Sequence, residues 1–585
     1  MSSDLSSTDP SAAGSGTVAE RGEGVVPDDS VRTTAEPADA AEPTLSGKPA
    51  ASGTPARRSH VRRAGAGLVT TLACLLMLFA LVVPSDLTGI TPGEFVRIPI
   101  DGLIGVALVA VLPPRPRLAV AVVAGIVLGL LAILKIADIG FYETLNRPFH
   151  PVFDWPILGS GAEFLIQTLG QAGGIAAIAV IGILLAGLFV LMTLSLLRLT
   201  RVVARHAAGA LRGTAVLAVA WVACAALGAQ LVPGVPVAGT ALGRLGQVPA
   251  DLNDHEKFAA QAAHDAFRGT PGSRLLTGLR GKDVIVSFVE SYGRVAIDNP
   301  DVVAALDAGS GRLRAAGFAA RSAYLTSPTF GGGSWLAHGT LLSGLWIDNQ
   351  RRYDSLVSSD RLTLTRAFKN AGWRTVAVMP GNTRPWAEAA FYGAQRVYDH
   401  WNIGYRGPGF NWGTPPDQYT MSAFQRFERQ APNHPPVMAE VALVTSHSPW
   451  APTPRLIDWK DVGDGSVFGP MAAAGDQPGE VWRSPSRVRA AFTNSVVYSL
   501  NTVLTYVETY GGDDLVMVFL GDHQPAPIVS GPDADHDVPI TIVARDPAVL
   551  DRISRWGWQD GLRPDSRAPV WRMDAFRDRF LRAFS

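Results

Sequence analysis

Cysteine is nearly absent from this sequence of 585 residues. The chain contains only two, Cys74 and Cys224, and both lie inside apolar segments of its N-terminal half. The C-terminal half therefore has no cysteine, which excludes a disulfide framework and a thiolate metal site in that part of the chain.

The sequence also lacks a net charge, because 51 lysines and arginines balance 51 aspartates and glutamates. No excess of basic residues points to a nucleic acid partner. Only 17% of the residues are charged and 47% are hydrophobic, a composition more apolar than that of most soluble proteins. This excess is concentrated between residues 64 and 233, so the chain is expected to be integral to a membrane.

Aromatic and long aliphatic residues are scarce in residues 1–63, which are rich in Ser, Ala, Gly, Pro, Thr, Asp and Glu. Such a segment cannot bury enough apolar surface to offset the entropy of ordering the chain, and we expect a disordered cytoplasmic tail. The first apolar run begins far beyond the usual position of a secretory signal peptide, so none is expected.

Five apolar segments follow, and residues 64–233 are predicted to form a five-helix transmembrane domain. A bilayer-spanning helix needs roughly 20 mainly apolar residues. The second segment is short and carries Asp101 near its start, whereas the third, fourth and fifth meet the length criterion well. The five predicted spans cover about residues 67–83, 98–112, 118–136, 175–197 and 214–232.

The distribution of arginine predicts the topology of these spans. Arginines cluster before the first span, between the second and third, and between the fourth and fifth, whereas the other two loops are mainly acidic. Under the positive-inside rule the arginine-rich segments are cytoplasmic. Five spans that start in the cytoplasm then place the N-terminus inside and the C-terminal domain outside the cell membrane.

Residues 234–281 read as a connector, and residues 282–585 as a large extracytoplasmic α/β domain. Apolar runs that suit buried strands alternate with amphipathic helical stretches such as 359–371 and 486–509. This alternation favours a mainly parallel central sheet covered on both faces. The four strand candidates are residues 284–289, 375–379, 441–445 and 515–520.

Polar residues follow each of these strand candidates. Glu290 follows the first strand candidate, and Asn382, Arg384 and Trp386 follow the second. His447 follows the third, and Asp522 and His523 follow the fourth. The carboxyl ends of parallel strands meet at one edge of a sheet, where ligands bind. Carboxylate oxygens and an imidazole nitrogen suit Zn or Mn. Taken alone, the Asp-His pair is also compatible with a simple strand-to-turn corner.

A glycine-rich loop, Gly331-Gly332-Gly333, precedes Ser334 and an apolar helix. Free N–H groups at a helix start bind anions such as phosphate or sulfate. Ser334 reads either as the N-cap of this helix or as a nucleophile. The neighbouring metal-ligand pattern favours the nucleophile, because a serine hydroxyl needs activation by a base or a metal ion.

The order of Glu290, the glycine-rich loop with Ser334, Ser446-His447-Ser448-Pro449 and Gly521-Asp522-His523 resembles the alkaline phosphatase/sulfatase superfamily. More narrowly, the apolar spans before this domain resemble the branch of lipoteichoic acid synthases and phosphoglycerol transferases, with phosphoethanolamine transferases as relatives. The resemblance implies an enzyme of the sulfatase-like α/β fold that acts in the cell envelope.

The resemblance also implies roles for individual residues. Glu290, Ser334, Asp522 and His523 would coordinate one Mn or Zn ion, and Ser334 would form a covalent phospho-enzyme. His447 would contact the transferred phosphate or protonate the leaving oxygen. The residues expected to bind substrate are Trp386, Arg384, Asn382 and His338, of which His338 is equally compatible with helix packing or capping.

This sequence departs from the branch pattern at two places. Pro380 stands where the pattern has a histidine, and Glu388 or a neighbour stands where it has an arginine. Arg384 is the candidate to replace that arginine. These departures leave the identity of the transferred head group open.

The predicted function is a membrane-anchored transferase that moves a phosphate-linked head group, phosphoglycerol or similar, from a phospholipid or lipid-linked donor to a cell-envelope glycan or lipid. A phosphodiesterase, a phosphatase or a sulfatase-like hydrolase of the same superfamily is the alternative. Leu336 and His338 stand where a sulfatase C/S-x-P-x-R motif has proline and arginine, which disfavours sulfatase chemistry. A non-catalytic membrane binding protein on the same fold is the second alternative.

Overall fold

The structure is a computed structural model that describes residues 55–85, 87, 99–227, 237–411 and 413–585. The chain divides into two compact units, Met1–Arg63 and Ala64–Ser585. Most of the predicted disordered tail, and the start of the predicted connector at residues 234–236, lie outside the described residues.

Long apolar helices make up the N-terminal region. By length and composition, four helical stretches suit a membrane span: Arg62–Val82, Pro114–Leu145, Gly170–Arg205 and Ala207–Ala226. They lie in α1 (Pro55–Val82), α3 (Pro114–Leu145), α4 (Trp155–Arg205) and α5 (Ala207–Ala226).

The second predicted span corresponds to α2 (Ile100–Val111), which has 12 residues. At about 1.5 Å per residue, a helix of this length reaches only about 18 Å, well short of the ~30 Å hydrocarbon core. The prediction of five spans is therefore not confirmed, although helices of sufficient length overlap the other four predicted segments. Residues 228–232 of the last predicted span lie outside the described residues.

Small residues bring α3 and α4 close together. A Cβ added at Gly125 would lie 2.9 Å from the Cα of Thr193, and one added at Gly129 would lie 2.8 Å from the ring of Phe189. Glycine at such positions lets two helix backbones approach, which is how helices associate where water supplies no hydrophobic driving force.

The C-terminal domain is built on one nine-stranded sheet with the strand order β4-β3-β5-β1-β6-β7-β2-β8, and β9 pairs with β2. Its strands are β1 (Asp283–Val289), β2 (Ala319–Thr326), β3 (Arg374–Met379), β4 (Arg396–Asp399), β5 (Val437–Leu443), β6 (Leu515–Gly521), β7 (Asp537–Ala544), β8 (Gln559–Asp560) and β9 (Val570–Arg572).

The sheet is mixed. The five strands from β4 to β6 pair in parallel, as predicted. At the other end β7 pairs antiparallel with both β6 and β2, and β2 pairs antiparallel with β8. The four strands predicted from the sequence all lie in the parallel part of the sheet, between β4 and β6. For this reason the sequence favours a mainly parallel sheet, whereas the structure has a mixed one.

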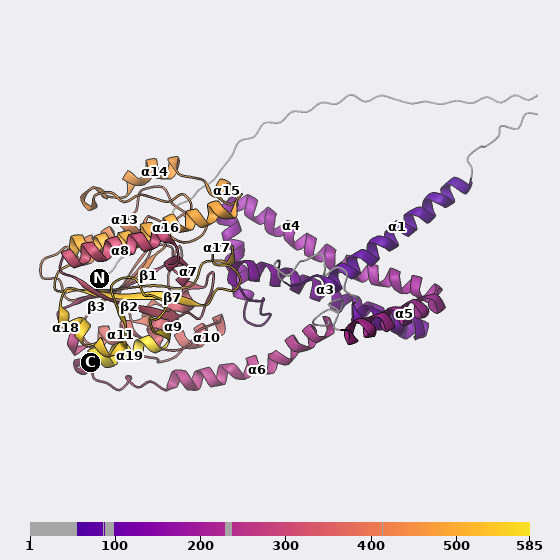
Figure 1. The fold of residues 1–585 in the computed structure, drawn as a ribbon, viewed down its shortest axis with the longest axis horizontal. Coiled ribbons are helices and arrows are strands. Elements are labelled where there is room, and N and C mark those ends of the chain that lie inside the picture. Colours follow the sequence, from indigo (N-terminus) through magenta and orange to yellow (C-terminus); the bar gives the residue numbers. More distant parts are fainter. Residues whose placement is uncertain (1–54, 86, 88–98, 228–236, 412) are drawn as a thin grey trace, which may run out of the picture. The chain divides into compact units, whose positions relative to one another are not determined.

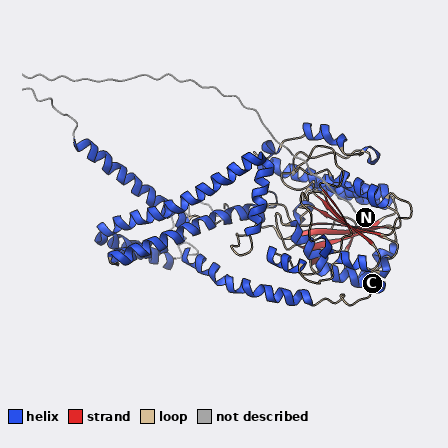
Figure 2. Cartoon of the chain, turned by 180° about the vertical axis from the view of Figure 1, so that it is seen from behind, coloured by secondary structure: helices blue, strands red, loops and turns tan. Residues whose placement is uncertain are grey.

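Helices cover both faces of the sheet (Figure 1), and Figure 2 shows the strands as one layer between them. Side chains of α8 (Pro300–Ala315) and α16 (Pro485–Tyr510) form one core with residues such as Val289. Side chains of α9 (Ser334–Ser343), α11 (Leu364–Asn370) and α19 (Ala575–Phe584) form the other, which includes Phe288. Adjacent residues of β1 thus enter opposite cores, which explains its continuous apolar run.

Three of the predicted strands match β1, β3 and β6 within one residue at each end. The third candidate, residues 441–445, corresponds to β5 (Val437–Leu443). The prediction starts too late because Glu440 interrupts the apolar run inside this strand. The remaining helices are α6 (Val237–Ala263), α7 (Arg294–Ile297), α10 (Gln350–Val357), α12 (Ala389–Tyr392), α13 (Asp417–Phe424), α14 (Gly469–Ala474), α15 (Pro478–Val481), α17 (Pro527–Ser530) and α18 (Pro547–Asp551).

Candidate active site and metal centre

The candidate site lies where β1, β5 and β6 end. In the register of the sheet Val289 is the partner of both Leu443 on β5 and Gly521 on β6. Glu290 and Asp522, each the next residue along its strand, therefore lie on neighbouring strands. The parallel register therefore brings the polar residues that follow these strands to one edge of the sheet, as predicted.

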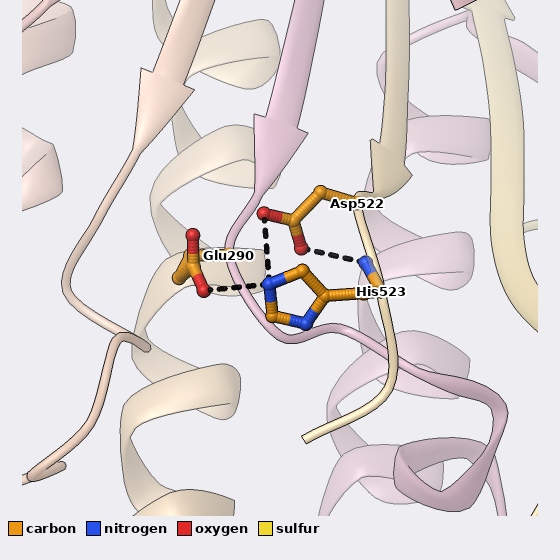
Figure 3. A group of neighbouring side chains, drawn as sticks. All are labelled: Glu290, Asp522 and His523. Carbon is orange, nitrogen blue, oxygen red and sulfur yellow. Dashed lines mark hydrogen bonds and ion pairs between the residues drawn. The ribbon is translucent and has the colours of Figure 1, made fainter. Parts of the chain in front are cut away.

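Glu290, Asp522 and His523 form a compact cluster of potential metal ligands, shown in Figure 3. One ligand atom from each lies within 4.8 Å of the others, and all three residues are buried. The Nε2 atom of His523 is 3.3 Å from Oε1 of Glu290 and 3.7 Å from Oδ2 of Asp522.

Backbone groups orient two of these side chains. Oδ1 of Asp522 accepts hydrogen bonds of 2.8 Å from the backbone N–H groups of Ser291 and His523, which leaves Oδ2 toward the cluster. Nδ1 of His523 is 2.8 Å from the carbonyl oxygen of Gln524. A carbonyl only accepts, so Nδ1 carries the proton and Nε2 is the nitrogen that faces the carboxylates.

The charges in the cluster are strongly coupled. Burial and the nearby charge of Glu290 together raise the pKa of Asp522 to about 7. Burial opposes the charged form of His523, but Asp522 and Glu290 outweigh it and raise the pKa of His523 to about 9. Burial also opposes ionisation of Glu290, yet His523 holds the pKa of Glu290 well below its usual value. The pocket between the carboxylates therefore favours a positive charge.

This donor set fits a divalent metal ion. Two buried carboxylates a few ångströms apart repel each other unless a cation lies between them. The oxygen atoms and one imidazole nitrogen are ligands that Mn and Zn accept. Glu290, Asp522 and His523 are thus positioned as the predicted ligand set requires.

Ser334 is the first residue of α9, and the preceding N-cap position is Gly333, whose φ of +82° is left-handed. The Ser334 hydroxyl donates a 2.9 Å hydrogen bond to Oε2 of Glu290 and lies 3.3 Å from Nε2 of His523. Ser334 is not the N-cap residue of α9, and its hydroxyl contacts the ligand cluster instead of capping the helix.

A cavity of about 510 Å³ opens beside this cluster. His447, Asn382, Trp386 and His338 line it together with Glu290, Ser334 and Asp522. Arg384 lies in the exposed segment Thr383–Pro385 and is not among the lining residues. The structure therefore brings all the predicted catalytic and substrate-binding residues except Arg384 to one cavity.

The loop that carries His447 is attached to the end of β1. The hydroxyl of Ser446 donates a 2.6 Å hydrogen bond to the backbone carbonyl of Glu290. This bond links the segment that bears His447 to the backbone of a metal-ligand candidate, so the two side chains are positioned together.

The sequence does not predict several of the residues that line this cavity, among them Glu440, Glu388, Tyr353 and Tyr392. A charged residue inside the apolar strand Val437–Leu443 was the available signal for Glu440. Glu388 was noted only as a departure from the expected arginine. Neither tyrosine lies in a recognisable motif, since helices α10 and α12 bring them to the cavity from separate parts of the chain.

Comparison with protein families gives one match. Residues 309–539 match the model of a family described as Sulfatase. A comparison with curated proteins finds no match.

Several solved structures are similar in fold. The lipoteichoic acid synthase LtaP from Listeria monocytogenes is 15% identical, with 46% of this chain and 66% of that chain covered and a TM-score of 0.34. This chain thus spans slightly less than two thirds of LtaP. The phosphoglycerol transferase GacH from Streptococcus pyogenes, solved in complex with sn-glycerol-1-phosphate, is 11% identical. The similarity covers 58% of this chain and 91% of that chain, with a TM-score of 0.34.

The lipooligosaccharide phosphoethanolamine transferase A (EptA) from Neisseria meningitidis, an integral membrane protein, is 12% identical. The similarity covers 88% of this chain and 95% of that chain, with a TM-score of 0.44.

The family match contains Ser334, His447, Asp522 and His523, whereas Glu290, on which the sequence resemblance also rested, lies before its first residue. Strands β2 to β6 lie within the matched residues. That resemblance is therefore confirmed. Residues 309–539 of this chain therefore belong to a sulfatase-family domain.

Proposed function

We propose that this protein is a metal-dependent transferase that moves a phosphate-linked head group from a phospholipid to a hydroxyl of a cell-envelope glycan or lipid. Ser334 forms the covalent intermediate. One observation carries the proposal: the Ser334 hydroxyl lies 2.9 Å from Glu290 and 3.3 Å from His523, inside the ligand cluster.

Glu290, Asp522 and His523, with the hydroxyl of Ser334, would hold one Mn or Zn ion. When bound, such an ion lowers the pKa of a coordinated hydroxyl and offsets the charge of a phosphate group. The free N–H groups at the start of α9, a helix of 10 residues, add positive potential where the phosphate would lie.

In the first step the Ser334 oxygen attacks the phosphorus of the donor phosphodiester. The bond between phosphorus and the diacylglycerol oxygen breaks, and Ser334 becomes esterified to the phosphate and its head group. Glu290 accepts the hydrogen bond of the Ser334 hydroxyl and is the group placed to take its proton. His447 lines the same cavity and would protonate the departing diacylglycerol oxygen.

In the second step a hydroxyl of the acceptor attacks the phosphorus of phospho-Ser334. The bond between phosphorus and the serine oxygen breaks. The acceptor proton passes to His447, which gave up a proton in the first step, and Glu290 returns the proton that it took from Ser334. Water in place of the alcohol would make the same intermediate the centre of a hydrolase.

The membrane region suits such a donor. An enzyme anchored by apolar helices meets lipid head groups in two dimensions, which raises their local concentration. We propose that residues 282–585 form the catalytic domain outside the cell membrane, with the N-terminus in the cytoplasm, as the arginine distribution favours.

The test uses the full-length protein in vesicles that contain phospholipid with a labelled acyl chain. Labelled diacylglycerol should appear, and mass spectrometry of rapidly quenched protein should find the phosphorylated head group on Ser334. The Ser334→Ala variant should give neither product. Unchanged diacylglycerol release by Ser334→Ala would remove Ser334 from the mechanism. Release of only inorganic phosphate or the free phosphorylated head group, with an alcohol acceptor present, would identify a hydrolase.

A further inference from the structure

The lining of the catalytic cavity is acidic. Four carboxylates line the cavity, those of Glu290, Glu388, Glu440 and Asp522, whereas no described lysine or arginine lines it. Glu290 and Asp522 belong to the ligand cluster and would be balanced by a bound cation. Glu388 and Glu440 remain, and a buried or half-buried carboxylate needs a partner or solvent.

Glu440 is fixed in place. Its side chain is 2% exposed, and its Oε1 accepts a 2.8 Å hydrogen bond from Nδ1 of His338. The imidazole ring of His338 stacks on Phe288 with the ring centroids 3.6 Å apart and the planes inclined by 14°. This arrangement holds one carboxylate at the inner end of the cavity and leaves its second oxygen for another donor.

Glu388 differs from Glu440 because it has no such partner. It occupies the N-cap position of α12, but its side chain makes no capping hydrogen bond there. Its half-buried carboxylate forms no hydrogen bond or ion pair with any other residue in the part of the chain that the structure describes. The carboxylate of Glu388 is therefore available to a ligand in the cavity that it lines.

Aromatic rings form the rest of this wall. The rings of Trp386 and Tyr392 lie 5.2 Å apart, and Tyr353 lines the cavity beside them. Tyr392 is only 1% exposed, yet its hydroxyl has no hydrogen-bond partner among the described residues. Burial, together with the charges of Glu388 and Glu440, raises the pKa of Tyr353 to about 12, so its hydroxyl stays protonated.

We propose that this wall, made of Tyr353, Trp386, Glu388, Tyr392 and Glu440, binds the ammonium group of the transferred head group. The donor is then a phospholipid with an amino-alcohol head group. This inference rests on the proposed function and adds the substrate class. Carboxylates and the faces of aromatic rings both attract an ammonium ion, and the attraction strengthens where water is excluded.

Charge distinguishes this donor from phosphatidylglycerol. A neutral glycerol head group would leave the carboxylate of Glu388 without a counter-charge in a half-buried site. Glu388 also stands near the place where the phosphoglycerol transferase pattern has an arginine, so the sign of the charge is reversed there. The cavity of about 510 Å³ is large enough for either head group, so volume does not decide between them.

The experiment lets two lipids compete in one vesicle. Full-length protein is reconstituted into vesicles with equal amounts of phosphatidylethanolamine and phosphatidylglycerol, whose acyl chains carry different labels. Each diacylglycerol product then identifies its donor. A single-turnover measurement needs no acceptor, because one diacylglycerol is released for each Ser334 that becomes phosphorylated. We expect phosphatidylethanolamine to be preferred about tenfold or more.

Variants of Glu388 test the origin of this preference. Glu388→Gln should reduce the preference for phosphatidylethanolamine about tenfold, and Glu388→Arg should favour phosphatidylglycerol. Glu480→Gln is the matched control, since Glu480 is an exposed glutamate that does not line the cavity. All variants should keep the metal content of the parent protein.

The outcomes separate this inference from the proposed function. No diacylglycerol from either lipid, or equal release by Ser334→Ala, would overturn the proposed function. Release from both lipids at equal rates, or a preference that Glu388→Gln leaves unchanged, would overturn the ammonium site alone. A preference for phosphatidylglycerol in the parent protein would also overturn it.

Discussion

The hydroxyl of Ser334 and the carboxylate of Glu290, 44 positions apart in the chain, meet at 2.9 Å. Strand β1 ends at Val289 and helix α9 begins at Ser334, and both termini lie at the same edge of the sheet. This contact brings a nucleophile candidate to a metal-ligand candidate.

Replacing Ser334 by threonine should preserve function. Threonine retains a hydroxyl at the same position on α9, so Ser334→Thr should keep activity within about tenfold, whereas Ser334→Ala should lose at least about a thousandfold. Diacylglycerol release measures both. Similar thermal unfolding of the two variants controls for folding, and a fully active Ser334→Ala protein would contradict the prediction.

Removing a ligand carboxylate should weaken metal binding. Glu290→Gln and Asp522→Asn each replace a buried anionic donor, and each should reduce the affinity for Mn or Zn at least about tenfold. Elemental analysis of protein dialysed against limiting metal measures this loss. Asp458→Asn, at a carboxylate that is 73% exposed, is the control. Equal metal content in all four proteins would exclude this cluster as the metal site.

Chelation should also lower the melting temperature of the parent protein. A ligand that binds only the folded state stabilises it by about 2.7 kcal/mol at one hundred times its Kd. Unfolding monitored by tryptophan fluorescence, with and without a chelator, should show this stabilisation. The shift should be absent in Asp522→Asn, and a parent protein that is insensitive to chelator would argue against a resident metal.

Asp417 should make stability depend on pH. Burial raises the pKa of Asp417 to about 6, although hydrogen bonds from Ser499 and Thr445 oppose the shift. Below about pH 4 the carboxyl is protonated in both the folded and unfolded states. Between about pH 4 and 6 only the folded state keeps the proton, so stability falls as pH rises, by up to about 3 kcal/mol.

The variant Asp417→Asn should remove this contribution, because an amide does not titrate. Its melting temperature should fall less between pH 4 and 7 than that of the parent protein, as measured by thermal unfolding at several pH values. Identical pH profiles for the two proteins would show that Asp417 does not titrate in this range.

Alanine at Gly333 should impair the site more than it impairs the fold. A left-handed φ of +82° is unfavourable for alanine by roughly 1–2 kcal/mol, and relief of the strain would move the adjacent Ser334. Gly281→Ala introduces a comparable strain at φ +77°, with no atom within 4 Å of the added Cβ. Both variants should lose similar stability, but only Gly333→Ala should lose turnover. Equal turnover would show that Ser334 tolerates the displacement.

The predicted topology can be tested with the two native cysteines removed. A cysteine at Ser486, an exposed position in the catalytic domain, should react with a membrane-impermeant maleimide in intact cells. A cysteine at His206, between α4 and α5, should react only after permeabilisation. The reverse pattern would invert the topology.

The sequence by itself determined the apolar helices, the alternation of strands and helices, and the identity of Glu290, Ser334, Asp522 and His523 as site candidates. Local patterns carry this information, since apolar runs and polar strand ends depend only on neighbouring residues. The same reasoning overestimated α2, because an apolar composition does not show where a helix stops.

Only the tertiary structure decided which side chains share a cavity. The antiparallel pairing of β7 with β6 and β2 depends on contacts between distant segments, which no local pattern encodes. The exposure of Arg384 and the placement of Glu388 beside Tyr353 and Tyr392 follow from the packing of α10 and α12 around the sheet. Residues from several separate segments determine the charge and shape of that wall. The sequence therefore identifies the chemical groups but does not show that they lie close together.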